Sequence, residues 1–137
     1  MKKFVFMITL LLVTSLSGCN LSNRMLADKM IEKYSDAQSY VALSGEITEV
    51  NENNVTIKCE ELNEYISYED ELCEYFIYSD EILELSVGDK MDFTTVPFHF
   101  YNGHKLPIVE LKIDGDTLLS FEEGKENLLY WVDTNFG

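Results

Sequence analysis

The sequence predicts a mainly β protein: a small five-stranded Greek-key barrel preceded by one short N-terminal helix. Three observations predict it. From Tyr40 onwards apolar and polar residues alternate, which is the period of half-buried strands. Turn signals rich in Asn, Asp and Gly separate these alternating stretches. Before Tyr40 the apolar residues recur every fourth position instead, which is typical of an amphipathic helix.

The chain begins with a segment that predicts export. Lys2 and Lys3 precede an uncharged apolar stretch, residues 4–16, that is too short to span a bilayer, since a spanning helix needs about 20 residues. The stretch ends in Leu16-Ser17-Gly18-Cys19, which resembles the lipobox of bacterial lipoproteins. The resemblance implies that residues 1–18 are a signal peptide. A short buried helix, or a signal peptide cut elsewhere, are the alternatives.

The same resemblance implies that Cys19 is lipidated and becomes the first residue of the mature protein. Its two acyl chains suffice for stable anchoring, whereas a single chain anchors only marginally. We therefore expect a lipid-anchored protein at the cell membrane that faces outside the cytoplasm. The lipid is the expected contact with the membrane.

Charge and length limit the classes of partner. Without the first 18 of its 137 residues the chain keeps 119, which fits one domain with its own core. All 25 acidic residues but only eight of the ten basic ones lie in this mature part, so its formal charge is −17. Such a surface repels phosphate backbones, and we expect no nucleic-acid partner. Cations, basic partners or simple solubility remain as explanations.

A helix is expected directly after a short tether at residues 19–24. Over residues 25–38 a single apolar stripe, formed by Leu26, Met30 and Tyr34, lies opposite charged side chains. The helix should end near residues 35–36, where polar residues accumulate. If it packs on the following domain the stripe is buried, and if it is a stalk the stripe is exposed.

The barrel domain, with a C-terminal extension, is expected over residues 40–137. Strands at 41–50 and 55–59 form a hairpin around the turn Asn51–Asn54, and a third strand follows at about 74–78. Between them, residues 60–72 are interpreted as an acidic loop or a frayed strand. One helical turn at residues 80–85 is expected to place Ile82 and Leu85 on the core.

The second half of the barrel follows the same pattern. A fourth strand at about 90–100 contains Pro97, which predicts an edge or a bulge. Asn102-Gly103 is a hairpin signal before a fifth strand at 106–113, in which Val109, Leu111 and Ile113 share one face. We expect core residues and then a short helix or coil at the end, namely Leu118, Leu119, Phe121, Leu128, Tyr130 and Trp131.

Five short strands with a brief helical turn between the third and fourth have the order of the OB-fold. Two segments carry the resemblance further: Gly45-Glu46-Ile47-Thr48-Glu49-Val50 and Leu85-Ser86-Val87-Gly88-Asp89-Lys90-Met91 are similar to the opening strand and the approach to strand four of anticodon-binding-like OB domains. The similarity covers about residues 41–121 and implies an OB-like barrel. Residues 58–80, where such domains present basic residues to nucleic acids, hold one Lys and no Arg among many carboxylates. Nucleic-acid binding is therefore not implied.

Seven aromatic residues cluster near the surface with which OB-folds usually bind ligands. Aromatic rings stack on sugars and anchor protein interfaces, which makes this set a candidate ligand-binding surface. Packing in the core or at a strand edge is the alternative. The set is Tyr65, Tyr68, Phe76, Tyr78, Phe98, Phe100 and Tyr101.

Metal ligands are a second candidate. His99 and His104 flank the Asn102-Gly103 turn and can face each other across it, with Glu110 or an acidic loop nearby. Two ordinary hairpin side chains are the alternative. The acidic cluster Glu60, Glu61, Glu64 and Glu69–Glu71 can bind calcium weakly, although it lacks the EF-hand pattern and also fits a solvated loop.

Cys59 and Cys73 form an even pair, which permits a disulfide in an oxidising compartment; two buried thiols are the alternative. The sequence holds no nucleophile, metalloprotease or phosphate-binding motif, so we expect neither an enzyme nor a cofactor. The leading hypothesis is a membrane-anchored, extracytoplasmic, non-enzymatic binding module for an envelope protein, peptide or glycan. A calcium- or zinc-binding envelope protein is the alternative, and a hydrolase of wall material is a third hypothesis.

Overall fold

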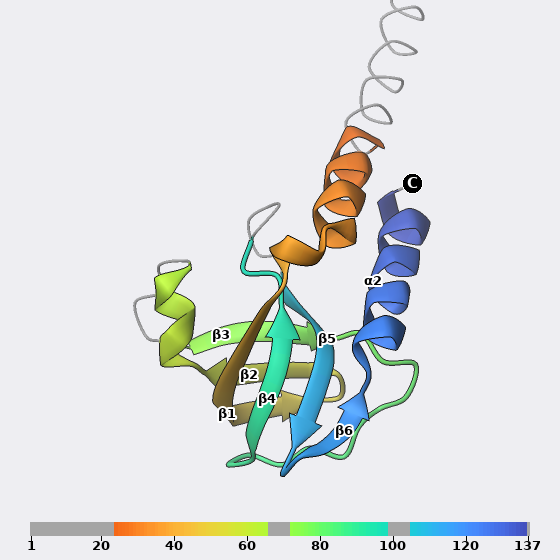
Figure 1. Ribbon diagram of the computed structural model, residues 1–137. Helices are drawn as coiled ribbons and strands as arrows, with labels where there is room; N and C mark the ends of the chain where they lie inside the picture. The colour runs from red at the N-terminus through yellow and green to blue at the C-terminus, as the bar shows by residue number, and fades with distance from the viewer. Residues whose placement is uncertain (1–23, 66–71, 99–104, 137) are drawn as a thin grey trace, which may run out of the picture.

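A closed barrel of five strands, with two helices packed beside one another above it, makes up the part of the chain that the computed structural model describes, residues 24–65, 72–98 and 105–136 (Figure 1). The fold class predicted from the sequence, a mainly β barrel preceded by a short helix, is confirmed. A sixth strand and a long C-terminal helix are added to it.

The elements follow one another along the chain in a simple order. A helix at residues 24–35 comes first. The remaining elements are η1 (Ala37–Ser39), β1 (Val41–Asn51), β2 (Asn54–Lys58), η2 (Glu60–Glu64), β3 (Leu72–Ile77), β4 (Lys90–Thr95), β5 (Leu106–Ile113), β6 (Asp116–Leu119) and α2 (Phe121–Phe136). The sheet order is β3-β2-β1-β4-β5-β6. A parallel pairing of Tyr75–Ile77 with Leu106–Ile108 joins β3 to β5 and closes the barrel.

The barrel interior is a single apolar cluster to which every strand contributes. Alternate positions of β1 and β4 point inward, as the two-residue period requires. Tyr75 and Phe93 meet edge to face inside it, with ring centroids 5.1 Å apart. Fully buried members of the cluster are Ile47, Ile57, Leu62, Tyr75, Ile77, Leu106, Ile108 and Leu111.

A bulge in β5 divides its apolar residues between two cores. Thr94 pairs with Glu110 but Thr95 pairs with Ile108, so Val109 is the extra residue on β5. The bulge turns Val109 outward, where it packs under the helices, while Ile108 and Leu111 on either side of it face the barrel. The prediction that Val109 and Leu111 share one face is therefore wrong, because strict alternation does not continue through a bulge.

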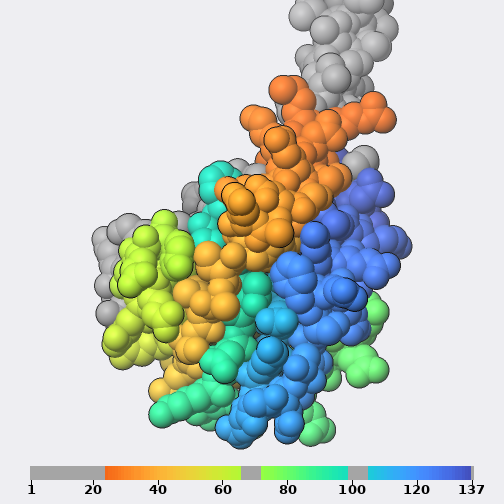
Figure 2. Space-filling model, in the orientation of Figure 1, coloured from red at the N-terminus to blue at the C-terminus, as the bar shows by residue number. Residues whose placement is uncertain are grey.

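The two helices run antiparallel and cover a second apolar cluster. At one end of the pair Lys125 Nζ lies 3.4 Å from the carbonyl oxygen of Ser35, and the rings of Tyr40 and Phe121 meet edge to face. Figure 2 shows the N-terminal helix in contact with α2. The buried members of the cluster are Ala27, Met30, Tyr34, Tyr78, Val96, Val109, Leu128 and Val132.

The predicted helical stripe is thus buried by packing. Met30 and Tyr34 are fully buried, and Leu26 is half-buried against the same cluster. The N-terminal helix is part of the domain rather than a stalk. It ends at residue 35, as expected, and the side chain of Asp36 then caps η1 by accepting a hydrogen bond from the backbone N–H of Gln38.

The helical turn predicted at residues 80–85 is not formed. The side-chain amide of Asn53 donates to the carbonyl oxygens of Ser79 and Glu81, both at 3.3 Å, and holds this segment against the β1–β2 turn. Ile82 is consequently 67% exposed instead of buried, whereas the half-buried Leu85 still packs on the barrel core.

Three other predicted boundaries move. β4 ends at Thr95, before Pro97, because proline has no N–H to donate to a strand ladder. Part of the acidic segment after β2 forms the helix η2, whose Leu62 is fully buried, and β3 begins at Leu72. The chain end is a regular 16-residue helix, α2, rather than a short helix or coil. The predicted Asn102-Gly103 turn lies outside the described residues.

Candidate functional site

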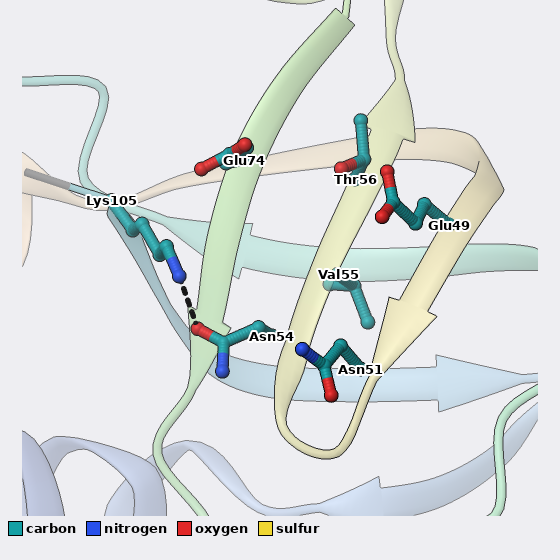
Figure 3. A pocket seen from close by; sticks show the side chains of 7 residues that line it. All are labelled: Glu49, Asn51, Asn54, Val55, Thr56, Glu74 and Lys105. Atoms are coloured by element: carbon teal, nitrogen blue, oxygen red, sulfur yellow. Dashed lines mark hydrogen bonds between the residues drawn. The ribbon is translucent and has the colours of Figure 1, made fainter. Parts of the chain in front are cut away.

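A polar pocket opens on the outer face of the three strands β1, β2 and β3 (Figure 3). It has a volume of about 110 Å³. Most of its lining side chains are polar, and they come from the β1–β2 hairpin, from β3 and from the start of β5. They are Glu49, Asn51, Asn54, Val55, Thr56, Glu74 and Lys105.

Strand register places two carboxylates on either side of a hydroxyl. Glu49 pairs with Thr56 across β1 and β2, and Thr56 pairs with Glu74 across β2 and β3. Neighbouring strands are about 4.8 Å apart, so the backbones of the two glutamates are separated by about 10 Å with Thr56 between them. Both glutamates are exposed and Thr56 is half-buried. The row therefore offers acceptor oxygens on three adjacent strands.

A bulge in β1 aims Glu49 at this row. Ile47 pairs with Ile57 but Glu49 pairs with Thr56, so Thr48 is the extra residue. Its hydroxyl donates to the carbonyl oxygen of Thr56 at 3.3 Å. Without the bulge, strict alternation would turn Glu49 toward the same side as Ile47, which is the barrel core.

The cation of the pocket is Lys105, which precedes β5. Its Nζ donates a 2.6 Å hydrogen bond to the side-chain oxygen of Asn54, and Figure 3 shows this bond at the edge of the pocket. The bond fixes the Asn54 amide and holds the ammonium group beside the hairpin. The pocket thus combines two exposed carboxylates with one half-buried, hydrogen-bonded lysine.

A second, wider depression lies over β1, β4 and the β5–β6 turn. Its volume is about 450 Å³, and one cross-strand pair inside it, Ser44 and Asp92, is joined by a 2.5 Å hydrogen bond from the serine hydroxyl. The depression is open and its carboxylates are solvated at the surface, so it is less defined than the pocket on β1–β3. Its lining residues are Ser44, Gly45, Glu46, Lys90, Met91, Asp92, Asp114 and Gly115.

Four residues of the predicted aromatic set are described by the structure, and these four do not form one exposed surface. Tyr78 is only 5% exposed because α2 covers it, and its ring meets Phe76 and Trp131 edge to face at 4.9 and 5.7 Å. Phe76 and Tyr78, two of the predicted ligand-binding residues, thus belong to the packing beneath α2. Tyr65, by contrast, is exposed after η2.

The ring of Phe98 is also exposed, with the ammonium group of Lys33 5.2 Å from its centroid. Tyr68, Phe100 and Tyr101 lie outside the described residues.

Most of the predicted metal ligands lie in segments that the structure does not describe. His99 and His104 lie outside the described residues, as do Glu69–Glu71 of the acidic cluster. Within the residues that are described, no three His, Cys, Asp or Glu side chains are grouped so that they could hold a metal ion. Glu60, Glu61 and Glu64 lie on η2 and are exposed.

Cys59 and Cys73 are buried in the barrel core as thiols, without a disulfide between them. Cys73 pairs with Ile57 on β2, whereas Cys59 lies just beyond the end of β2 and is the N-cap of η2. The thiols therefore act as small apolar groups here, and burial raises the pKa of the Cys59 thiol.

None of the residues that line the β1–β3 pocket belongs to the candidate site residues predicted from the sequence. Alternation alone puts Thr56 and Glu74 on the outer face, since each lies between two inward residues of its strand. A row of outward-facing polar residues on successive strands is the sequence feature that could have indicated this pocket. Lys105 joins the row only through the parallel β3–β5 pairing, which short-range patterns do not reveal.

Within the described part of the chain, no helix has both the length and the apolar character needed to cross a membrane. The chain matches no protein-family model, and no curated protein matches it. Among solved structures it is similar to Ag(I)CusF, at 16% identity over 55% of this chain and 97% of that chain, with a TM-score of 0.37. It is similar to apo-CusF from Escherichia coli at 15% identity over 55% of this chain and 87% of that chain, with a TM-score of 0.39. It is also similar to CusF-Ag(I) from Escherichia coli at 16% identity over 55% of this chain and 91% of that chain, with a TM-score of 0.39.

Proposed function

We propose that this chain is a lipid-anchored, extracytoplasmic and non-enzymatic binding module, and that it holds its partner on the outer face of β1, β2 and β3. The observation that carries the proposal is the pocket on that face, with Glu49 and Glu74 flanking Thr56. The lipobox-like segment supports the anchor, since its cysteine precedes the folded domain by only a short tether.

The chemistry of the pocket favours a partner that donates hydrogen bonds and carries positive charge. Two glutamates whose backbones are about 10 Å apart can receive an ammonium or guanidinium group between their carboxylates, beside the Thr56 hydroxyl. An anionic group would meet both carboxylates and a mature chain of charge −17. A basic segment of an envelope protein or peptide, or an amino-sugar glycan, fits this description.

The pocket can be tested with a matched pair of variants. In one, Glu49→Gln and Glu74→Gln remove the two negative charges of the pocket; in the other, Glu84→Gln and Glu126→Gln remove two exposed negative charges elsewhere. Hydrogen bonds to a charged group contribute about 1.5–3 kcal/mol each, so the first variant should bind at least about tenfold more weakly. Binding would be measured on arrays of basic peptides and of amino-sugar glycans.

Equal binding by the two variants would exclude the pocket as the binding face. A second experiment, crosslinking on living cells with the mature lipoprotein as bait, identifies the partner. The same two variants serve as its controls. Loss of the crosslinked species in the pocket variant alone is the expected result.

The metal-binding alternative is tested separately. Calorimetric titration of the mature chain with calcium and with zinc, before and after His99→Ala and His104→Ala, should show no difference if the module works through the pocket. Heat that disappears in the histidine variants would favour the alternative.

A further inference from the structure

We infer that the open end of the helix pair faces an anionic lipid surface, so that the domain stands upright on the membrane with its barrel held away from it. This inference rests on the anchoring part of the proposed function. It concerns a surface formed by residues 24–29 of the N-terminal helix and residues 130–136 of α2, far from the pocket-forming strands in the fold.

The start of the N-terminal helix and the end of α2 lie on the same side of the molecule. Ser35 and Lys125 are in contact at the barrel end of the pair, and from there each helix runs 11 residues to its last described position, back to Arg24 and forward to Phe136. At 1.5 Å per residue both reach about 16 Å beyond that contact. Figure 1 shows the two ends side by side, with the barrel at the opposite end of the molecule.

The expected anchor is close to this end. Cys19 precedes Arg24 by five residues, which span at most about 18 Å even when fully extended. The start of the N-terminal helix therefore cannot move further than that from the lipidated residue. A tether of this length still lets the domain tilt, so a second property must select the orientation.

Charge distribution selects it. The open end carries two basic residues, Arg24 and Lys29, and two acidic ones, Asp28 and Asp133, and is neutral. The rest of the mature chain therefore carries the whole charge of −17. Anionic lipids repel this negative charge strongly within a Debye length, which is about 8–10 Å at moderate salt. An orientation in which the barrel lies on the membrane surface is therefore disfavoured. Standing upright puts Arg24 and Lys29 beside the phosphates instead.

Exposed apolar side chains at this end agree with a lipid interface. Met25 is 60% exposed and Tyr130 is 72% exposed, although the inner faces of both helices are buried. Tyrosine favours the boundary between water and lipid, because one end of its ring is apolar and the other carries a hydroxyl.

The chain carries a built-in probe for this orientation, because Trp131, its single tryptophan, lies on α2. The mature lipoprotein would be placed in phosphatidylglycerol–phosphatidylcholine vesicles that contain a dansyl-labelled headgroup lipid, and energy transfer from the tryptophan would be measured. A second protein, with Trp131→Phe and Leu118→Trp, moves the donor to β6 at the barrel end. Ten helical residues separate 121 from 131, so the donor moves by at least about 15 Å.

We expect severalfold stronger transfer from Trp131 than from the donor at position 118. In 1 M salt, where the Debye length falls to about 3 Å, the difference should shrink. Equal transfer, or stronger transfer from position 118, would overturn the upright orientation while leaving the anchor intact. If mass spectrometry shows no diacylglyceryl group on the chain and the chain does not float with the vesicles, the proposed anchor is wrong, and the proposed orientation with it.

Charge reversal separates orientation from simple attraction. Arg24→Glu with Lys29→Glu reverses the two charges at the open end, and Lys58→Glu with Lys90→Glu makes the same change of charge on the barrel; all four side chains are exposed. The substitutions at the open end should make energy transfer from position 131 and from position 118 similar. The substitutions on the barrel should leave transfer from position 131 the stronger. The same effect from both pairs would contradict the proposed membrane-facing surface.

Discussion

Replacing Gly124 by alanine should destabilise the domain, although the same change in an ordinary helix stabilises it. Gly124 is buried in the first half of α2, where the helix crosses the bulge of β5. A Cβ atom built there overlaps the carbonyl oxygen of Val109 and lies 2.5 Å from its carbonyl carbon and 2.6 Å from its Cα. These are backbone atoms of a paired strand, so they cannot rotate away.

The size of the effect follows from the displacement of α2. Ordinary contacts to a Cβ atom begin at about 3.4 Å, so the helix must retreat from β5 by about 1 Å or more, and a gap of that size forfeits a quarter to a half of each dispersion contact. Leu128 and Val132, one and two turns further on the same face, are fully buried and would loosen with it. Partial loss of their burial and the strain of overpacking exceed the gain of about 1 kcal/mol from alanine's helix propensity. We expect a net loss of about 2–3 kcal/mol.

Urea unfolding and thermal unfolding, both followed by Trp131 fluorescence, measure this change in stability, because the tryptophan lies on the displaced helix. For a domain of this size the melting temperature should fall by about 6–15 °C. Glu126→Ala, at an exposed position of the same helix, is the control and should change stability by less than about 0.5 kcal/mol. If Gly124→Ala raises the melting temperature, the close packing of α2 on Val109 is refuted.

The remaining predictions concern the N-terminal helix, pH and one turn. Met30→Ala should cost about 2–5 kcal/mol in urea unfolding because its side chain is fully buried, whereas Met25→Ala should cost almost nothing; equal effects would contradict the packed helix. Burial raises the pKa of the Cys59 thiol and of the Tyr40 hydroxyl, so the unfolded chain loses these protons first. Stability should be complete below about pH 9 and fall above it, less so in the Cys59→Ala variant; a flat alkaline limb in both proteins would refute this. Glu52 has φ of 56° in the β1–β2 turn, so Glu52→Gly should raise the melting temperature through a gain of up to about 1 kcal/mol, and a decrease would argue against that turn.

Local patterns were sufficient where an element depends on its own side chains. The stripe of Leu26, Met30 and Tyr34 predicted a helix and named the residues that became buried. Alternation located β1, β2 and β5 closely, because each has one face on the barrel core. The closed barrel was predicted correctly even though the helical turn at 80–85, one of its supports, is not formed.

Features that depend on distant parts of the chain were missed. The C-terminal segment was predicted as a short helix or coil, whereas it forms the 16-residue α2. Gly124 lowers helix propensity by about 1 kcal/mol, yet this glycine is what permits the close approach to Val109. With α2 underestimated, Tyr78 was assigned to an open binding face instead of the packing beneath that helix.

The pocket was missed although β1 carries a sign of the bulge: two polar residues, Thr48 and Glu49, stand together between Ile47 and Val50, so the strict alternation breaks there. Bulges and helix–strand contacts are set by tertiary packing, which periodicity does not describe.

The contact between the first and the last helix has a consequence for how the chain folds. Met30 and Tyr34 are covered in part by Leu128 and Val132, so the earliest helix of the domain waits for about 100 further residues before its apolar stripe is buried. Barrel closure has the same dependence, because β3 pairs in parallel with β5 rather than with its neighbour in sequence. A chain that emerges N-terminus first must therefore keep the apolar stripe of its first helix exposed until α2 emerges. Shortening the chain at its C-terminal end should therefore act on the folding of its N-terminal helix, although the two segments are far apart in the sequence.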